Sequence, residues 1–419
     1  MQQMKNSGIE WIGEIPESWD IIKTKNIFRY FKRIVGNRHV ETERLALTLN
    51  GVIKRDKNEA DGLQPEKFDT YQFLYKNELV FKLIDLGNIA TSRVGLSPFD
   101  GMVSPAYIIL RSECSDNRFY YYFYLSMWHR NIFNSLGDNG VRSSIGANDL
   151  LNLPIVNTTE AARIRIADFL DKKCVDIDNL IAHEVAAIEE LKAYKQSVIT
   201  ETVIKGLDKS VPMKDSGVEW IGQIPASWSI VKTKNIFRNV KRIVGDQHAE
   251  TERLALTLNG VIKRDKNEAT GLQPENFETY QFLYRNELVF KLIDLGNVAT
   301  SRVGLSPFDG MVSPAYIILQ NKFTDNRFYL YFFLSMWYRQ IFNALGDNGV
   351  RSSLNAQDLL NIPTVLLPEP ERKKISDYLD KKCAEIDDFI SIKQQKIEEL
   401  KEYKKSLIYE YVTGKKEVV

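Results

Sequence analysis

The sequence has few of the residues from which metal centres and disulfide frameworks are built. Its 419 residues include three cysteines, Cys114, Cys174 and Cys383, and four histidines. The cysteines form no Cys-x-x-Cys pair, and no histidine lies near them at the spacing of metal ligands. This pattern argues against a zinc site and a disulfide framework, and it favours packed free thiols. We expect no metal site.

The sequence also lacks the short motifs of common catalytic and nucleotide-binding sites. It contains no Walker-type phosphate loop, no Gly-x-Gly-x-x-Gly turn, no His-Glu-x-x-His pair and no Gly-x-Ser-x-Gly elbow. No apolar run approaches the roughly 18 residues of a membrane span, and the N-terminus lacks the pattern of a secretory signal. We therefore expect a protein without catalytic residues or a membrane segment, located in the cytoplasm.

What the sequence does contain is an internal duplication. Residues 41–60 recur letter for letter at 250–269, and the offset of 209 residues holds without a gap from Ser7 to the C-terminal region. Between residues 41–110 and 250–319 only five positions differ, whereas the copies diverge beyond about Thr158. A chain of this length usually exceeds one hydrophobic core. We conclude that the repeat unit is a whole domain rather than a solenoid repeat.

Each copy divides into two kinds of structure. The first part has short β-branched and aromatic runs separated by Gly and Asn turns, which is typical of a compact mixed domain. Within it, residues 116–137 are predicted to form one helix, capped by Asp116 and ended by Gly137. The aromatic cluster from Phe119 to Tyr124 could stack on bases, but a buried helix is the stronger interpretation.

The second part of each copy, from Glu160 and from Glu369, is predicted to be one long helix of some 42 residues, about 60 Å. Apolar residues recur at spacings of 4, 7, 3 and 7, with polar interruptions at Glu184 and Lys393. The seam residues are Ile177, Ile181, Ile188, Leu191 and Val198 in the first copy and Ile386, Ile390, Ile397, Leu400 and Leu407 in the second. This pattern predicts that the two helices pack together as a coiled coil.

Positive charge is concentrated near the start of each copy. Although the net charge of the chain is only +1, residues 23–57 hold ten Lys or Arg against three acidic residues, and the second copy keeps nine of the ten. Such a stretch favours contact with nucleic-acid phosphates, and the alternative is an ordinary solvated surface.

Three turn-rich segments could supply amides, hydroxyls and Arg forks to read base edges. The candidate DNA-binding residues are Asn50, Lys54, Arg55, Lys57, Lys82, Asn88, Ser92, Arg93, Arg142, Ser143 and Ser144 in the first copy, and Asn259, Lys263, Arg264, Lys266, Lys291, Asn297, Ser301, Arg302, Arg351, Ser352 and Ser353 in the second. Arg55, Arg93 and Arg142 rank first, because Arg bound to guanine is the commonest specific contact.

Several motifs in a fixed order resemble a known family. The chain contains "SGIEWIGEIPESW", "LTLNGVIKRD", "DGMVSPAYIIL" and "GVRSSIGANDLLNLPI", followed by the helix "RIRIADFLDKKCVDIDNLI". The series repeats in the second copy and ends in "RKKISDYLDKKCAEIDDFI". Together they strongly resemble the specificity subunit of type I restriction-modification systems, over essentially the whole chain.

The resemblance implies an α+β fold with two target-recognition domains in tandem, each followed by a long helix. It places domains at 1–158 and 209–367 and helical spacers at 159–208 and 368–419. The two helices would pair as an antiparallel coiled coil with pseudo-two-fold symmetry. Each domain would read one half of a split sequence in double-stranded DNA.

The resemblance also implies that this chain carries no catalysis and binds no cofactor. Two modification subunits would transfer a methyl group from S-adenosylmethionine to adenine, and restriction subunits would use ATP and Mg for translocation and cleavage. Because the reading segments are nearly identical, we expect a palindromic split target. A coiled-coil assembly scaffold and a stand-alone DNA-binding regulator are the alternatives.

Overall fold

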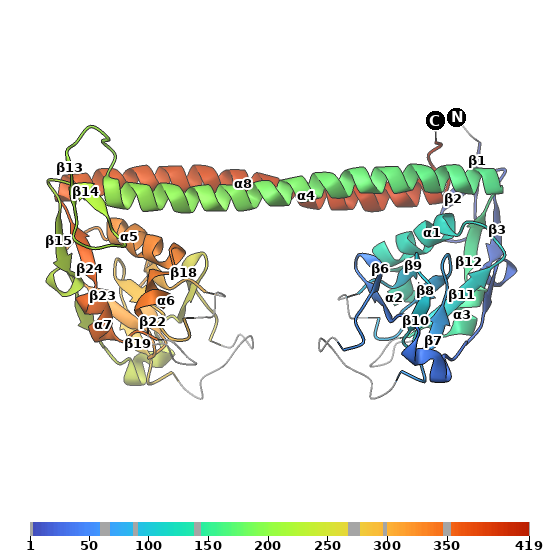
Figure 1. The fold of residues 1–419 in the computed structure, drawn as a ribbon, viewed down its shortest axis with the longest axis horizontal. Helices are drawn as coiled ribbons and strands as arrows, with labels where there is room; N and C mark the ends of the chain where they lie inside the picture. Colours follow the sequence, from blue (N-terminus) through green and yellow to red (C-terminus); the bar gives the residue numbers. More distant parts are fainter. Residues whose placement is uncertain are drawn as a thin grey trace. The chain divides into compact units, whose positions relative to one another are not determined.

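The computed structural model describes residues 3–58, 68–86, 91–137, 144–266, 277–295, 300–346 and 353–418. The chain forms two compact units (Figure 1). Unit 1 comprises Met1–Val185 with Gln395–Val419, and unit 2 comprises Ala186–Gln394. Each unit therefore contains one mixed domain together with helical segments from both copies of the duplicated sequence.

The domain of unit 1 is built mainly from short antiparallel strands. Its strands are β1 (Met4–Asn6), β2 (Glu14–Pro16), β3 (Asp20–Lys23), β4 (Phe28–Tyr30), β5 (Leu45–Thr48), β6 (Gly51–Lys54), β7 (Gln72–Leu74), β8 (Leu79–Phe81), β9 (Val94–Leu96), β10 (Gly101–Val103), β11 (Ile108–Ser112) and β12 (Pro154–Asn157). A four-stranded sheet has the order β4-β11-β8-β9, and β5 and β6 form a hairpin. Helices α1 (Arg118–His129), α2 (Ile132–Leu136) and α3 (Ala147–Asn152) complete this α+β domain, which confirms the predicted fold class.

The domain of unit 2 repeats this topology. Its strands are β13 (Met213–Asp215), β14 (Gln223–Pro225), β15 (Ser229–Lys232), β16 (Arg238–Val240), β17 (Leu254–Thr257), β18 (Gly260–Lys263), β19 (Gln281–Leu283), β20 (Leu288–Phe290), β21 (Val303–Leu305), β22 (Gly310–Val312), β23 (Ile317–Gln320) and β24 (Pro363–Leu366). Its helices are α5 (Arg327–Tyr338), α6 (Ile341–Leu345) and α7 (Ala356–Asn361). The sheet order β16-β23-β20-β21 is the equivalent of the order in unit 1.

The two predicted long helices are α4 (Glu160–Lys205) and α8 (Glu369–Val412). The interior of α4 contains neither Gly nor Pro, and the only Pro of α8 is in its first turn, where the missing N–H has no partner to lose. Gly206 follows α4 with a φ of +74°, the left-handed conformation that ends helices.

Within each unit α4 and α8 run antiparallel. In unit 1, Asp178 pairs with Lys404 at 2.7 Å and Glu184 pairs with Lys396 at 2.6 Å, so residue numbers rise along α4 as they fall along α8. In unit 2, Lys195 of α4 pairs with Asp387 of α8 at 2.6 Å. The predicted seam residues lie along this pairing, and all ten are buried or half-buried. The predicted pairing of the helices is confirmed.

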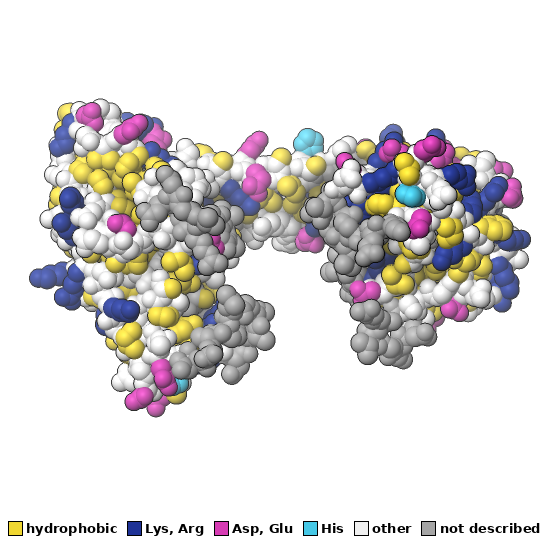
Figure 2. All heavy atoms as spheres, turned by 60° about the horizontal axis from the view of Figure 1, so that its bottom comes forward, with side chains coloured by type: hydrophobic (Ala, Val, Ile, Leu, Met, Phe, Trp, Pro, Cys, Tyr) yellow, Lys and Arg dark blue, Asp and Glu magenta, His cyan; other side chains and the backbone are white. Residues whose placement is uncertain are grey.

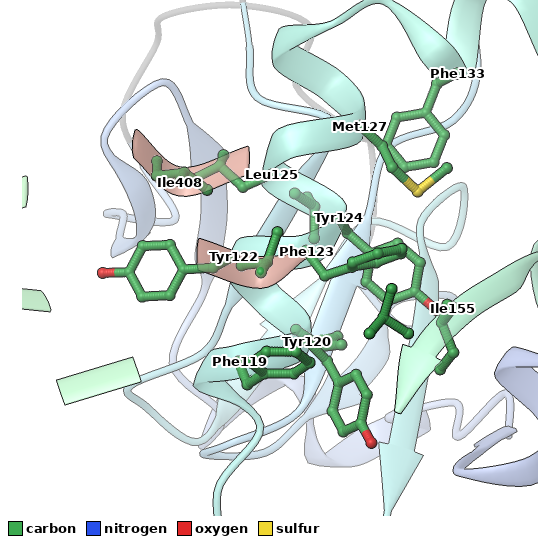
Figure 3. Close-up of a cluster of buried hydrophobic side chains, with 14 of the residues drawn as sticks. Phe119, Tyr120, Tyr122, Phe123, Tyr124, Leu125, Met127, Phe133, Ile155 and Ile408 are labelled. Carbon is green, nitrogen blue, oxygen red and sulfur yellow. The ribbon is translucent and has the colours of Figure 1, made fainter. Parts of the chain in front are cut away.

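The aromatic cluster of α1 forms the centre of the unit 1 core. Phe119, Tyr120 and Tyr124 are at most 1% exposed, and Figure 3 shows them packed with Ile155 of β12. Ile408 of α8 lies on the other side of the same helix (Figure 3) and is fully buried. These residues therefore form a core rather than a base-stacking platform. α1 fixes the domain to the long helix.

The prediction of one helix over residues 116–137 is wrong in two respects. The structure has two helices, α1 and α2, because Asn131 adopts the left-handed conformation with a φ of +57°. Asn tolerates this conformation better than most residues, yet a single Asn gives no clear sequence signal of a break. The C-terminal end was placed correctly, since Gly137 caps α2. The N-cap of α1 is Asn117 rather than the predicted Asp116, which lies one residue earlier and accepts from the N–H of Arg118.

Candidate nucleic-acid interface

The basic stretch of unit 1 does not form one uniform surface. Lys23, Lys25, Arg29, Lys32, Arg38 and Lys54 are exposed, whereas Arg33, Arg55 and Lys57 are half-buried and Arg44 is buried. On the face visible in Figure 2, Lys and Arg side chains are interspersed with hydrophobic and acidic ones. The positive charge therefore has to be examined site by site.

Four of these residues, Arg38, Arg44, Arg55 and Lys57, gather at what we call the basic end of unit 1. The backbone N–H of Arg55 donates to the carbonyl of Arg44, and Arg44 donates to the carbonyl of Asp56 at 3.1 Å. Lys57 Nζ donates to the carbonyl of Val40 at 2.7 Å. These contacts hold the segment that follows β6 against the segment that precedes β5.

A glycine allows this close approach. A Cβ on Gly101 of β10 would lie 2.6 Å from the carbonyl oxygen of Glu43, a backbone atom that cannot move aside locally. The next residue, Met102, donates its N–H to that same oxygen at 2.8 Å. Gly101 thus positions Arg44 and, through it, Arg55.

Two guanidinium groups of this region lie over aromatic rings. Arg38 lies 4.4 Å from the ring centroid of Phe73, and Arg33 lies 4.7 Å from that of Tyr75. The Phe73 and Tyr75 rings stack on each other at 5.9 Å. Sequence reasoning missed this layer of Arg and aromatic side chains, because the partners lie about 40 residues apart in the chain.

The basic end of unit 2 is the same except at one position. Arg253 donates to the carbonyl of Asp265 at 3.3 Å, Arg264 donates its N–H to Arg253, and Lys266 donates to Ala249 at 2.6 Å. Gln247 stands where unit 1 has Arg38. The predicted residues Arg264 and Lys266 therefore have the same surroundings as Arg55 and Lys57.

The exposed lysines of the hairpins point to solvent with only weak ionic contacts. Lys54 Nζ lies 3.8 Å from Glu43 and 5.5 Å from the ring centroid of Phe99. Lys263 Nζ lies 3.4 Å from Glu252. Exposed pairs of this kind contribute little to stability, so both lysines are available to an external phosphate.

Arg93, one of the three residues ranked first, is inside the domain and only 1% exposed. Its guanidinium donates to the carbonyls of Lys82, Ile84 and Asp85 at 3.3, 3.2 and 2.8 Å. Asp85 is left-handed, with a φ of +52°. Burial lowers the pKa of the Arg93 guanidinium. In this conformation Arg93 shapes the turn after β8 and does not reach solvent.

The neighbouring predicted residues support the same turn. Ser92 is 2% exposed and donates from its hydroxyl to the carbonyl of Val94 at 2.7 Å. Lys82 Nζ donates to the hydroxyl of Thr91 at 3.1 Å. Burial, and next the nearby Arg93, lower the pKa of Lys82.

Unit 2 builds an equivalent turn. Arg302 is 1% exposed and donates to the carbonyls of Lys291, Ile293, Asp294 and Leu295. Ser301 donates to Val303 at 2.7 Å, and Lys291 donates to Thr300 at 3.2 Å.

Two of the three predicted segments are brought together. The N–H of Ile145 donates to the carbonyl of Leu83 at 2.9 Å, so the exposed Ser144 lies beside the turn that Arg93 holds. In unit 2 the N–H of Leu354 donates to Leu292 at 2.9 Å, which places the half-buried Ser353 in the same way.

The third predicted segment is the hairpin tip. Asn50 is exposed at the turn between β5 and β6, and its N–H donates to Thr48. In unit 2, Asn259 at the equivalent tip lines a crevice of about 560 Å³ together with Lys195 of α4 and Asp387 of α8. The tip of unit 2 therefore faces the helix pair, and the predicted residue Ser301 lines the same crevice. Asn88, Arg142, Ser143, Asn297, Arg351 and Ser352 lie outside the described residues.

A polar cluster that sequence reasoning missed fastens α1 to α4. Arg118 pairs with Asp116 at 2.5 Å, Asp168 at 2.7 Å and Asp171 at 2.5 Å. The Tyr122 hydroxyl donates to Asp171 at 2.6 Å. Although burial of the Asp116 carboxyl acts in the opposite direction, hydrogen bonds from Arg118 hold its pKa below the ordinary value.

Unit 2 has the same arrangement of Arg327 with Asp325, Asp377 and Asp380. The signal was present in the sequence, because Asp-Asn-Arg and a pair of Asp three apart on the long helix recur in both copies.

Among the described residues, no group of three or more His, Cys, Asp and Glu side chains is arranged to hold a metal ion. In the same part of the chain, no helix is both long and apolar enough to cross a membrane.

No family model matches the sequence. The chain is 24% identical over 428 residues to the putative type I restriction enzyme MjaX specificity subunit of Methanocaldococcus jannaschii, covering 96% of this chain and 95% of that protein. It is 23% identical over 258 residues to the type I restriction enzyme MjaVIII specificity subunit of the same organism, covering 57% of each.

A solved structure from work on "complex assembly and conformational transition of the type I R-M system" has a TM-score of 0.68 to this chain, at 12% identity. The match covers 95% of this chain and 98% of that one. At this level of identity the likeness shows the fold.

Proposed function

The chain belongs to the family of specificity subunits of type I restriction-modification systems, and we propose that it reads a split DNA target with palindromic half-sites. In this proposal each unit reads one half-site and directs adenine methylation and restriction by partner subunits. The chain itself contributes no catalytic group, and the partners bind S-adenosylmethionine, ATP and Mg.

The observation that carries the proposal is the sameness of the two units where DNA reading is predicted. Arg93 and Arg302 hold equivalent turns, and Arg55 and Arg264 have equivalent neighbours. Identical readers bind identical base sequences. If the two units read opposite strands, the two half-sites are inverted copies of each other.

The contacts divide the predicted residues into different roles. Lys54 and Lys57, with Lys263 and Lys266, are proposed to neutralise phosphates, because their ammonium groups lie at or near the surface. Arg93 and Arg302 are proposed to position the turns beside Ser144 and Ser353. Base reading is assigned to Arg55 and Arg264 and, outside the described residues, to Arg142 and Arg351.

The first test is whether adenine methylation in cells depends on this chain. The chain is expressed with its partner methyltransferase, and methylated adenines are quantified with and without it. The proposal predicts sequence-specific methylation only when the chain is present. Methylation that is independent of the chain would contradict the proposal and favour an assembly scaffold.

A second test examines base reading directly. Arg142 and Arg351 are changed to Ala together, and binding to the target and to single-base variants is compared. Loss of a bidentate Arg contact should cost about 1–3 kcal/mol and relax discrimination at one base pair of each half-site. An equal loss of affinity for all sequences would assign the two residues to phosphate contacts instead.

A further inference from the structure

Unit 1 contains an open pocket of about 750 Å³ that is separate from the basic end. It lies where β4, β11 and the start of α4 meet, and its lining includes Arg29, Arg111, Arg163 and Cys114. Phe31, which is 52% exposed, forms part of its wall. Arg29 belongs to the basic stretch of residues 23–57, whereas Arg111, Arg163, Cys114 and Phe31 were not among the basic or DNA-binding residues predicted from the sequence.

Two of the arginines face each other across paired strands. Arg29 of β4 lies directly opposite Arg111 of β11, and like charges in this position destabilise a sheet. Arg29 donates only to backbone carbonyls, those of Lys25 and Phe28. The Arg111 guanidinium forms no hydrogen bond or ion pair with any residue that the structure describes. Two guanidinium groups are both hydrogen-bond donors and cannot bond to each other, so no direct contact between the two side chains offsets their repulsion.

The equivalent position in unit 2 is internally satisfied. Arg238 lies opposite Gln320, and Gln320 Oε1 accepts from Arg238 Nε at 3.1 Å and from Nη2 at 2.7 Å. One substitution between the copies, Arg111 for Gln320, thus turns a bonded pair into two opposed cations. The register of these two strands is the same in both units.

The third arginine also differs between the units. In unit 1, Arg163 donates to Asn157 Oδ1 at 3.3 Å and stays half-buried at the pocket. In unit 2 the equivalent Arg372 is 6% exposed and lies 3.8 Å from the ring centroid of Phe323. Phe323 takes the position of Cys114 and stacks on Tyr329 at 6.0 Å. The ring of Phe323 therefore fills space in unit 2 that the smaller thiol of Cys114 leaves open in unit 1.

We propose that the pocket of unit 1 binds the phosphate of a nucleotide, with Arg29 and Arg111 as the phosphate ligands. Planar guanidinium groups bind phosphate oxygens in pairs, and a doubly charged phosphate relieves the repulsion between the two arginines. The exposed Phe31 offers a ring on which the base can stack. The nucleotide is either free, with a doubly charged monoester phosphate, or part of a DNA strand, with singly charged diester phosphates. Each offers phosphate oxygens to the two arginines and a base to Phe31.

Two carboxylates also line the pocket and define its selectivity. Glu160 accepts from the hydroxyl of Ser115 at 2.9 Å, and Glu113 lies on the strand end beside Arg111. With three arginines against these two carboxylates, the lining keeps a single positive charge. The pocket is therefore expected to hold one phosphate group between Arg29 and Arg111.

Calorimetric titration of the purified full-length chain tests the proposal. The probes are inorganic phosphate, adenosine monophosphate and a tetrathymidylate of single-stranded DNA. We expect one site per chain, and at least a tenfold loss of affinity in R111Q, which introduces the residue that unit 2 carries. Because Gln is accommodated at the equivalent position of unit 2, R111Q is expected to fold, and its thermal midpoint serves as the control.

A gain of binding provides the converse test. Q320R alone should not create a site, because Phe323 still fills the pocket of unit 2. The double variant Q320R/F323C should raise the stoichiometry for inorganic phosphate from one site to two, because both phosphate ligands are then present in unit 2. Binding of adenosine monophosphate identifies a free nucleotide as the ligand, and binding of tetrathymidylate alone identifies a DNA strand. Binding unchanged in R111Q, two sites in the unmodified chain, or no binding of any probe would overturn the proposal.

The alkylation rate of Cys114 provides a second measurement of binding that is independent of calorimetry. Burial raises the pKa of Cys174 to about 11 and also raises that of Cys383, so these thiols react slowly. Cys114 is only half-buried and should be alkylated first. A bound nucleotide is expected to slow its alkylation by iodoacetamide, measured by mass spectrometry, and R111Q should abolish this protection. An alkylation rate that saturating probe leaves unchanged would contradict the proposed site.

Discussion

The two units are versions of one domain, and they differ in an uneven way. Exposed hydrophobic residues of the hairpin persist in both, with Leu49 and Leu258 57% and 58% exposed and Ile53 and Ile262 both 42% exposed. By contrast, the exposed Phe31 that follows β4 in unit 1 corresponds to the half-buried Val240 in unit 2. A core does not require an exposed leucine. The surface of the hairpin is therefore the same in both units, whereas the surface near β4 is not.

The same comparison separates structural arginines from surface ones. Arg93 and Arg302 are equally buried and hold equivalent carbonyls, whereas Arg111 and Gln320 differ in both charge and bonding. Identity between the units at a buried position follows from folding. Identity at an exposed position, such as Lys54 and Lys263, has no such explanation.

The largest effect is expected from Arg93→Ala. The change leaves the carbonyls of Lys82, Ile84 and Asp85 without this donor and creates a cavity, so we expect a loss of about 3 kcal/mol in the free energy of unfolding. Urea unfolding of the full chain measures it. Arg93→Lys should not restore stability, because one ammonium cannot replace the planar fork.

The matched variant Arg302→Ala should lower the free energy of unfolding by the same amount as Arg93→Ala, within about 0.5 kcal/mol. If Arg93 instead read bases directly, Arg93→Ala would leave unfolding unchanged and relax the DNA specificity. That outcome would remove the structural role assigned to this residue.

Breaking the cluster that fastens α1 to α4 should have a somewhat smaller effect. Arg118→Ala leaves Asp116 and Asp171 as neighbouring carboxylates, and the cluster is about one-third exposed, so we expect a loss of about 2 kcal/mol. Arg327→Ala should give the same loss in unit 2. Urea unfolding that differs between these two variants by more than about 1 kcal/mol would contradict the equivalence of the clusters.

His129 sharpens the comparison, because unit 2 has Tyr338 at this position. Burial, and next the nearby Lys405 and Lys404, lower the pKa of His129 from 6.5 to about 4. Between these values the unfolded chain binds more protons than the folded chain, so stability falls as pH is lowered from 6.5 to 4. At pH 5 the loss attributable to His129 is about 2 kcal/mol.

The variant His129→Tyr should remove this part of the pH dependence while leaving stability at neutral pH nearly unchanged. Chemical unfolding at pH 5 and pH 7.5 measures it. If the variant and the unmodified chain had the same pH dependence, the pKa of His129 would not be lowered in the folded chain, which would contradict the effect of burial.

The smallest effect is expected from the exposed lysines. Lys54→Ala combined with Lys263→Ala should reduce the salt slope of DNA binding by about 2, one for each lost phosphate contact, without changing base preference. Fluorescence anisotropy at several salt concentrations measures this. Lys209→Ala is the control, because its ammonium side chain is 89% exposed and it belongs to neither hairpin. An unchanged slope would assign Lys54 and Lys263 to the solvated surface.

The sequence was sufficient to predict the structure where its pattern is local and repeated. The seam from Ile177 to Val198 follows helical spacing, and the pairing of α4 with α8 was predicted from it. The burial of Phe119 and Tyr124 followed from the aromatic composition of α1. In each case the spacing or composition that predicts the structure lies within a few turns of one element.

The rest depends on contacts between distant residues. Arg93 follows a turn-rich segment and looked like a surface residue, but its acceptors are carbonyls eight to eleven positions earlier. The opposition of Arg29 and Arg111 depends on strand register across 82 residues. Asn50 sits on a hairpin tip whose direction depends on packing of β6 against β9, where Gly95 leaves room for Leu47. No local pattern encodes these placements.

The palindromic target is the central claim, and the sequence of methylated sites tests it most directly. Single-molecule sequencing of DNA from cells that contain this chain and its methyltransferase partner maps every methylated adenine. The account predicts one split motif whose two halves are inverted copies. A split motif with unrelated halves would contradict it and would assign specificity to the few positions, such as Arg38 and Gln247, at which the two units differ.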